Sequence, residues 1–144
     1  MASHVIILLI SISGLLTSCT TSGQTGEIEI AQKRWKAANI ETYSADIERI
    51  CFCPPPSKYT IVVDSDSLTK VINSETGEEI AEDYGYSTVD ELFQWLLEAA
   101  SRNPQKLELE FDDKLGYPTL IDYNQSDGIA DEEMLIRILD LRQR

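Results

Sequence analysis

Two cysteines separated by one residue, Cys51 and Cys53, are the first side chains whose spacing suggests chemistry. In an extended strand, side chains two positions apart point to the same face, and their Cα atoms lie about 6.6 Å apart. That separation is close to the upper limit of about 6.8 Å for a disulfide. In an oxidising compartment we therefore expect these two cysteines to form a disulfide with each other.

A redox or thiol–metal site is the alternative use of this pair. Reactive dithiols usually have a thiol pKa that is lowered by a helix N-terminus or a nearby cation, whereas here prolines follow at positions 54–56. Two thiolates without a further His or Cys make an incomplete tetrahedral metal site. We favour the structural disulfide, and a thiol–disulfide redox protein stays open as a competing function.

A second candidate site is an acidic segment near the C-terminus, in which oxygen-bearing side chains follow the spacing of a calcium-binding loop. The first, third, fifth and last positions of such a loop are occupied by Asp122, Asn124, Ser126 and Glu133. The glycine of the loop comes one place late, at Gly128, and a predicted strand precedes the segment where a helix is required. We favour a solvated acidic loop, with a calcium-binding module as the alternative, and we predict no cofactor.

Composition narrows the remaining chemistry. The single histidine, His4, lies in a segment that we expect to be removed. The rest of the chain can then build neither a Ser-His-Asp nor a Cys-His catalytic group, nor a zinc site that needs imidazole. A net charge of −13 repels phosphate backbones and anionic headgroups. These properties favour a non-enzymatic protein and argue against nucleic acid as a partner.

The N-terminus has the pattern of an export signal. Residues 5–16 are uncharged and mostly apolar, too few for a membrane span of about 20 residues but typical of a signal-peptide core. The sequence Leu16-Thr17-Ser18-Cys19 follows and resembles the bacterial lipobox. The resemblance implies cleavage before Cys19, acylation of Cys19, and a lipid anchor in a membrane of the cell envelope. An ordinary secretory signal and an uncleaved anchor are the alternatives.

The hydrophobic pattern predicts one domain with an α+β fold. We expect a signal peptide over residues 1–18, the lipidated Cys19 and a flexible tether over 19–26, and a single domain over 27–144.

Within that domain, apolar positions at helical spacing start at Glu27, and Thr88 begins a second helix with a capping box. Alternating segments predict strands at 42–53, 58–63, 68–73, 107–111 and 117–123. Residues 132–144 have a helical composition but alternate like a strand. We therefore predict an antiparallel sheet of five or six strands with two packed helices.

Several of these features together resemble a known family. They are the helix around Trp35, the strand from Tyr43 into Cys51-Phe52-Cys53, the helix start Thr88-Val89-Asp90-Glu91-Leu92-Phe93, the turn Gly116-Tyr117-Pro118-Thr119, and Asp131-Glu132-Glu133 near the end. In this order they resemble a family of uncharacterised bacterial putative lipoproteins, a domain of unknown function. The resemblance implies secretion, an α+β fold and a terminal strand, and it implies no activity. We expect a membrane-tethered envelope protein that acts as an interaction or ligand-binding module, with an envelope protein as a candidate partner.

Overall fold

The structure is a computed structural model that describes residues 21–144 except 127 and 129. The described elements in chain order are α1 (Thr21–Ala38), β1 (Tyr43–Cys51), β2 (Lys58–Asp64), β3 (Ser67–Asn73), α2 (Val89–Ser101), β4 (Lys106–Phe111), β5 (Pro118–Asn124), the 3-10 turn η1 (Ala130–Glu132) and β6 (Met134–Gln143). The predicted α+β fold is confirmed. Among the described residues, no helix is both long and apolar enough to cross a membrane.

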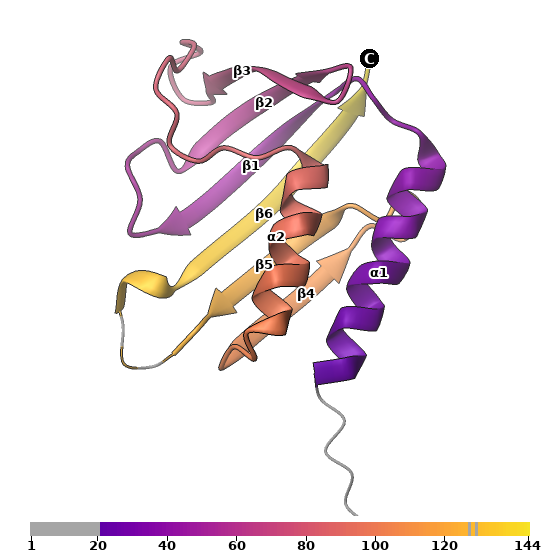
Figure 1. Cartoon of the computed structure of the whole chain (residues 1–144). Coiled ribbons are helices and arrows are strands. Elements are labelled where there is room, and N and C mark those ends of the chain that lie inside the picture. The colour runs from indigo at the N-terminus through magenta and orange to yellow at the C-terminus, as the bar shows by residue number, and fades with distance from the viewer. Residues whose placement is uncertain (1–20, 127, 129) are drawn as a thin grey trace, which may run out of the picture.

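The strands form one sheet of order β3-β2-β1-β6-β5-β4, and every neighbouring pair is antiparallel. Figure 1 shows both helices on the same face of this sheet. The C-terminal segment is a strand, as the family resemblance implied, and it lies at the centre between β1 and β5. Its alternation decides this outcome, because Ile136 and Ile138 are buried on the face that the helices cover.

Helix α2 packs its buried apolar side chains across the middle of the sheet. The Thr88 hydroxyl accepts a hydrogen bond from the Glu91 backbone N–H, and the Glu91 carboxylate accepts one from the Thr88 N–H, so the capping box is present. The Tyr43 hydroxyl accepts a further hydrogen bond from the Val89 N–H at 2.8 Å. This link fixes the start of α2 against β1, while Phe93 and Leu96 are fully buried between helix and sheet.

Helix α1 begins at Thr21, earlier than the start at Glu27 that the apolar spacing predicted. The described part of the expected tether, residues 21–26, is therefore helical. The Gln24 side-chain amide donates to the Leu107 carbonyl at 2.9 Å and so connects this early turn to β4. Further along, Trp35 is buried and anchors the helix. Its indole N–H donates to Asp90 at 3.1 Å, which joins α1 to α2.

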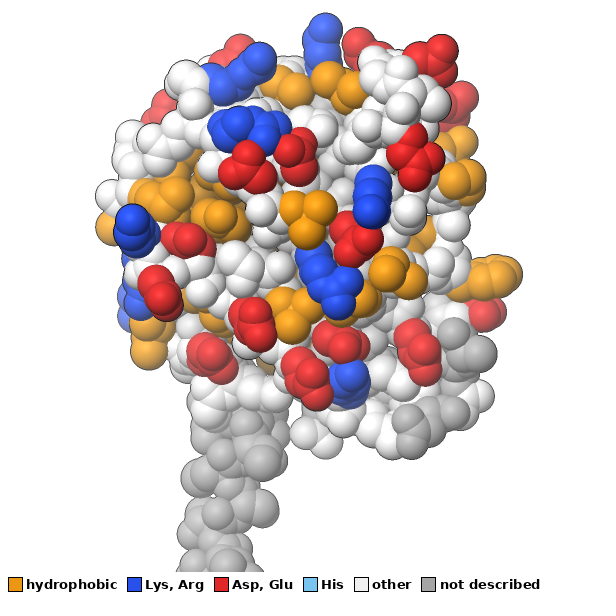
Figure 2. Space-filling view, turned by 180° about the vertical axis from the view of Figure 1, so that it is seen from behind, with side chains coloured by type: hydrophobic (Ala, Val, Ile, Leu, Met, Phe, Trp, Pro, Cys, Tyr) orange, Lys and Arg blue, Asp and Glu red, His pale blue; other side chains and the backbone are white. Residues whose placement is uncertain are grey.

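The opposite face of the sheet carries charged side chains among apolar ones (Figure 2). Ion pairs connect neighbouring strands across this face. Glu48 of β1 pairs with Lys58 of β2 and with Arg137 of β6, and Asp46 pairs with Arg142. Cross-strand pairs of opposite charge stabilise a sheet modestly at exposed positions. This face is consequently polar enough to stay in contact with water.

Candidate functional site

Arg49 is a charged residue that the alternation of β1 turns toward the helices. It follows Ile47 by two positions and therefore shares the buried face of the strand. Only 7% of its surface is exposed. Arginine is rarely buried to this extent unless it is paired, so its surroundings identify the most unusual site in the described part of the chain.

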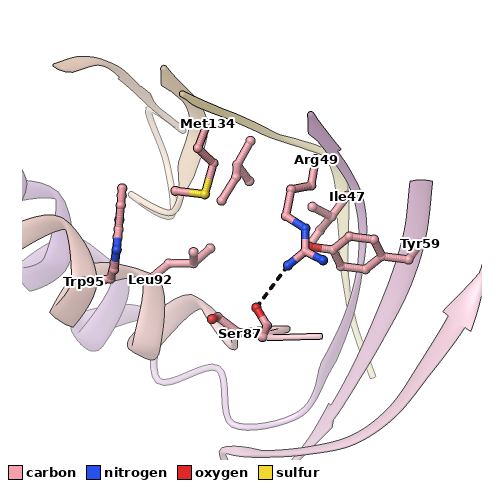
Figure 3. Close-up of a pocket in the computed structure, with 9 residues that line it drawn as sticks. Ile47, Arg49, Tyr59, Ser87, Leu92, Trp95 and Met134 are labelled. Atoms are coloured by element: carbon pink, nitrogen blue, oxygen red, sulfur yellow. Dashed lines mark hydrogen bonds between the residues drawn. The ribbon is translucent and has the colours of Figure 1, made fainter. Parts of the chain in front are cut away.

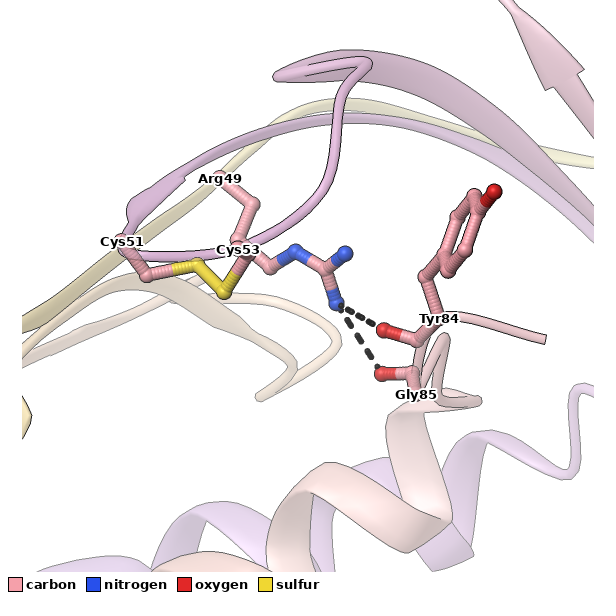
Figure 4. Close-up of a disulfide and its surroundings, with 5 residues drawn as sticks. All are labelled: Arg49, Cys51, Cys53, Tyr84 and Gly85. Carbon is pink, nitrogen blue, oxygen red and sulfur yellow. Dashed lines mark hydrogen bonds between the residues drawn. A yellow bond between two sulfur atoms is a disulfide. The ribbon is translucent and has the colours of Figure 1, made fainter. Parts of the chain in front are cut away.

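Two backbone carbonyls and two aromatic rings surround the guanidinium. Its Nη1 donates to the carbonyl oxygens of Tyr84 at 3.0 Å and Gly85 at 3.1 Å, as Figure 4 shows. Its Cζ lies 5.4 Å from the ring centroid of Tyr59 and 5.0 Å from that of Tyr86, distances at which a cation–π attraction operates. The arginine thus ties the segment before α2 to the sheet.

The second terminal nitrogen of the guanidinium has no comparable partner. Within the described residues, Nη2 is buried without a hydrogen-bond acceptor, and Arg49 takes part in none of the ion pairs formed there. A buried cation without an opposite charge is expensive in free energy. Arg49 is therefore held in place by neutral groups while its charge is left without a counter-charge from the described part of the protein.

A small pocket lies beside Arg49, between the sheet and the first half of α2. It encloses about 120 Å³. Figure 3 shows Trp95 and Leu92 of α2 opposite Arg49, Ile47 and Tyr59, with Met134 and Ser87 closing the other two sides. The Trp95 ring is held edge-on against Tyr123, with 5.0 Å between centroids. Apolar side chains therefore form most of the wall, and Arg49 supplies its one charged group.

The tyrosines beside Arg49 do not supply the missing negative charge. Burial raises the pKa of Tyr59 to about 12, although the Arg49 charge opposes the rise. Burial also raises the pKa of Tyr86, again against the effect of Arg49. Both phenols consequently stay neutral at physiological pH. The pocket offers a cation and apolar contacts, which suits binding better than proton transfer.

The cysteine pair lies at the end of β1. The Sγ atoms of Cys51 and Cys53 are at bonding distance, and their Cα atoms are 5.2 Å apart. The strand was predicted to continue to Cys53, but it ends at Cys51 and the chain bends at Phe52, which brings the Cα atoms closer than in an extended strand. Cys53 is exposed. Disulfide formation in the exported protein stays a prediction.

The calcium candidates are distributed over β5, the segment after it and the residue before β6, and the side chains of Asp122 and Asn124 have other partners. Asp122 is on β5 and accepts a hydrogen bond from the Lys106 ammonium at 2.8 Å. The Asn124 side-chain oxygen accepts one from the Ser126 backbone N–H at 3.0 Å, and Glu133 lies between η1 and β6. Across the described residues, no group of three or more His, Cys, Asp or Glu side chains is placed to hold a metal ion. Cys19, the lipidation candidate, lies outside the described residues.

Comparison with known proteins places the chain in a family. A family model described as a family of unknown function, DUF6174, matches residues 27–143. The chain belongs to this family. The DUF6174 match runs from α1 to the end of β6 and so includes every strand of the sheet and the whole Arg49 pocket. No curated protein and no solved structure matched the chain.

The resemblance to a domain of unknown function agrees with the DUF6174 match. The match assigns a family and no function. Arg49 was not predicted as a site residue from the sequence. The available signal was its position two residues after Ile47 on a predicted strand, where alternate residues share a face. The tyrosines that surround it come from a neighbouring strand and from the segment before α2, and their proximity depends on strand pairing that the local pattern does not contain.

Proposed function

We propose that this protein is a non-enzymatic ligand-binding module that an acylated Cys19 holds at a membrane of the bacterial envelope. The pocket beside Arg49 is its binding site. The observation that carries the proposal is the buried Arg49, which lines this pocket and has no ion-pair partner among the described residues. Protein binding sites commonly combine apolar walls with a few polar groups that orient the ligand.

The rigidity of the pocket wall supports binding. Leu92 and Trp95 project from a helix whose start is fixed by a capping box and by the Tyr43 hydroxyl. Arg49 is held by two carbonyls on the segment that leads into the same helix. Sites on such supported elements need little reorganisation when a ligand enters, which reduces the entropic cost of binding.

Binding in this pocket can be tested with four-carbon probes. We would record the two indole N–H signals of the protein by NMR during separate titrations with butanoate, butanamide and butan-1-ol. Trp95 lines the pocket, whereas Trp35 is buried under α1 and serves as the internal control. The expected result is a saturable shift of the Trp95 signal alone, lost in Ser87→Leu because the larger side chain fills the pocket. If none of the probes moves the Trp95 signal, the binding site is wrongly assigned.

The membrane tether is tested independently of the pocket. Cys19→Ala should abolish fatty-acid labelling and release the protein from the membrane fraction, since acylation of that residue is the proposed anchor. Ser18→Ala, a change beside the modified residue that keeps a small side chain, is the control and should leave labelling intact. Unchanged labelling of the Cys19→Ala protein would contradict the lipoprotein assignment.

A further inference from the structure

One of the two terminal nitrogens of the Arg49 guanidinium has no hydrogen-bond acceptor among the described residues. Nη1 is occupied by the carbonyls of Tyr84 and Gly85, while Nη2 is buried without an acceptor among the described residues. Buried donors in proteins almost always have an acceptor. The strongest acceptor for a guanidinium is an anionic oxygen, because a charge-assisted hydrogen bond is roughly twice as strong as a neutral one.

The charge of Arg49 points to the same kind of group. The two aromatic rings against it stabilise a cation but carry no net charge, since burial keeps their phenols protonated. Glu82 and Asp83 lie on the segment that precedes the site, but both are exposed, and neither forms an ion pair with Arg49. An anion that entered the pocket would therefore offset a charge that the described part of the protein leaves uncompensated.

The size and lining of the pocket limit what can carry this anion. A volume of about 120 Å³ is comparable to that of a buried cavity of about 150 Å³ that binds benzene. Ile47, Leu92, Trp95 and Met134 make most of the wall apolar. A phosphate dianion fits poorly, because it needs several donors and would meet the field of a chain with a net charge of −13. A single negative charge on a short hydrocarbon group fits well.

We propose that the pocket recognises a carboxylate carried on a short apolar group, with the charged guanidinium of Arg49 attracting the carboxylate and the apolar group lying between Trp95 and Met134. This inference rests on the proposed function, since it names the ligand class of the same pocket. Two sources present this chemistry. One is a free short-chain carboxylic acid, and the other is the C-terminus of a polypeptide that ends in a small apolar residue.

Comparing an acid with its amide tests the role of the charge. Butanoate and butanamide have the same size and shape, so calorimetric dissociation constants for the two isolate the contribution of the carboxylate. The wild-type protein is expected to bind butanoate at least about tenfold more tightly than butanamide, as expected when a charge-assisted hydrogen bond replaces a neutral one. In Arg49→Met, which keeps a side chain of similar length, the two dissociation constants should become equal.

Equal affinities of the wild-type protein for acid and amide would overturn the carboxylate assignment, and so would a preference for the acid that survives in Arg49→Met. The comparison within the wild-type protein needs no variant, so it decides the question even if Arg49→Met does not fold.

Failure of the proposed function would give a different set of results. If butanamide and butan-1-ol shift the Trp95 signal while the acid has no advantage, the pocket is a binding site with another ligand class, whereas if no probe shifts that signal, both proposals fall.

The two sources are separated by a pair of peptides. N-acetyl-Ala-Ala-Val with a free C-terminus and the same peptide with a C-terminal amide differ only in the terminal charge. If the free peptide binds more tightly than butanoate and its amide binds at least about tenfold more weakly, the source is a polypeptide C-terminus. If butanoate binds more tightly than the free peptide, the source is a small carboxylic acid. Equal binding of the two peptides, together with equal binding of acid and amide, counts against recognition of a carboxylate.

Discussion

At the residue scale, the cysteines at the end of β1 separate a structural role from a redox role. We predict that Cys51 and Cys53 are joined to each other in the exported protein, because their Sγ atoms lie at bonding distance. Intact-mass analysis under non-reducing conditions should find the protein two hydrogens lighter than its reduced form. Replacing both cysteines with Ser should lower stability only modestly, since closing so short a loop removes little chain entropy. Free thiols, or a cysteine-dependent disulfide-exchange activity, would favour the redox alternative.

Asp46 makes a residue-scale prediction about pH. Hydrogen bonds from Arg142, which holds both carboxylate oxygens, and from Thr60 lower the pKa of Asp46 below its usual value of 3.8. A carboxylate whose pKa is lower in the folded state stabilises the fold above its unfolded pKa, and this contribution disappears as the pH falls through the folded pKa. Urea unfolding should therefore show a larger acid-induced loss of stability for the wild-type protein than for Asp46→Asn.

The Asp46–Arg142 pair lies on the open face of the sheet, where solvent screens the charges. Its contribution to the acid-induced loss of stability is therefore small. We expect a difference below about 1 kcal/mol between the two proteins when the loss from pH 6 to pH 3 is compared. Glu75→Gln is a suitable control, since Glu75 is exposed in a turn where its carboxylate forms no ion pair with another described residue. An acid loss in Asp46→Asn equal to that of the wild-type protein would contradict the assignment.

The sequence could predict residues whose role depends on neighbours close in the chain. Thr88 and Glu91 form the expected capping box, and Cys51 and Cys53 approach each other as their spacing indicated. The sequence did not reveal Arg49 as a site residue. The role of Arg49 depends on Tyr59 of β2 and Tyr86 of the segment before α2, which lie beside its guanidinium only in the folded protein. Such contacts follow from strand pairing and helix docking over long separations in sequence, and no local periodicity encodes them.

At the level of the elements, the turn before β5 packs closely against α1, and this contact requires glycine at position 116. Gly116 has a φ of +83°, and a Cβ atom there would lie 2.4 Å from the Ala31 carbonyl oxygen and 2.9 Å from the Arg34 Cβ. Gly116→Ala should therefore cost the left-handed strain of about 1–2 kcal/mol and a further cost of about 1–3 kcal/mol for displacing the helix. Chemical denaturation at neutral pH measures the sum.

Gly77 provides the matched control for this prediction. Its φ is +75°, but a Cβ atom there would meet nothing within 4 Å. Gly77→Ala should consequently show the backbone strain without the cost of displacing a neighbour. Equal losses in unfolding free energy for the two variants would mean that the close approach of the turn to α1 contributes nothing to stability.

The elements themselves were largely predictable from periodicity, and the differences occur at their ends. The alternation of β6 competed with a helix-favouring composition, and the strand formed because it buries Ile136 and Ile138 between β1 and β5. Helix α1 extends to Thr21 although no apolar spacing indicated it, and there Gln24 bonds to β4. Tertiary contacts decided both outcomes, and a window of sequence does not contain them.

At the scale of the whole molecule, the two faces of the sheet divide stability from binding. The helices cover one face and build the core, and the Arg49 pocket forms at the edge of that core where the segment before α2 crosses the sheet (Figures 1 and 3). The other face is held by ion pairs between strands and remains polar (Figure 2). This arrangement leaves Arg49 as a fixed cation beside an apolar pocket, which is the basis of the proposed function.

The most direct test of this account is to observe the guanidinium of Arg49 itself. Side-chain NMR signals of the arginines can be followed while butanoate is added to the folded protein. We predict a saturable shift of the Arg49 signal and a much smaller change when butanamide replaces the acid. The exposed Arg34 is the control and should not respond. An Arg49 signal that stays in place, or one that moves only as much as that of Arg34, would contradict it.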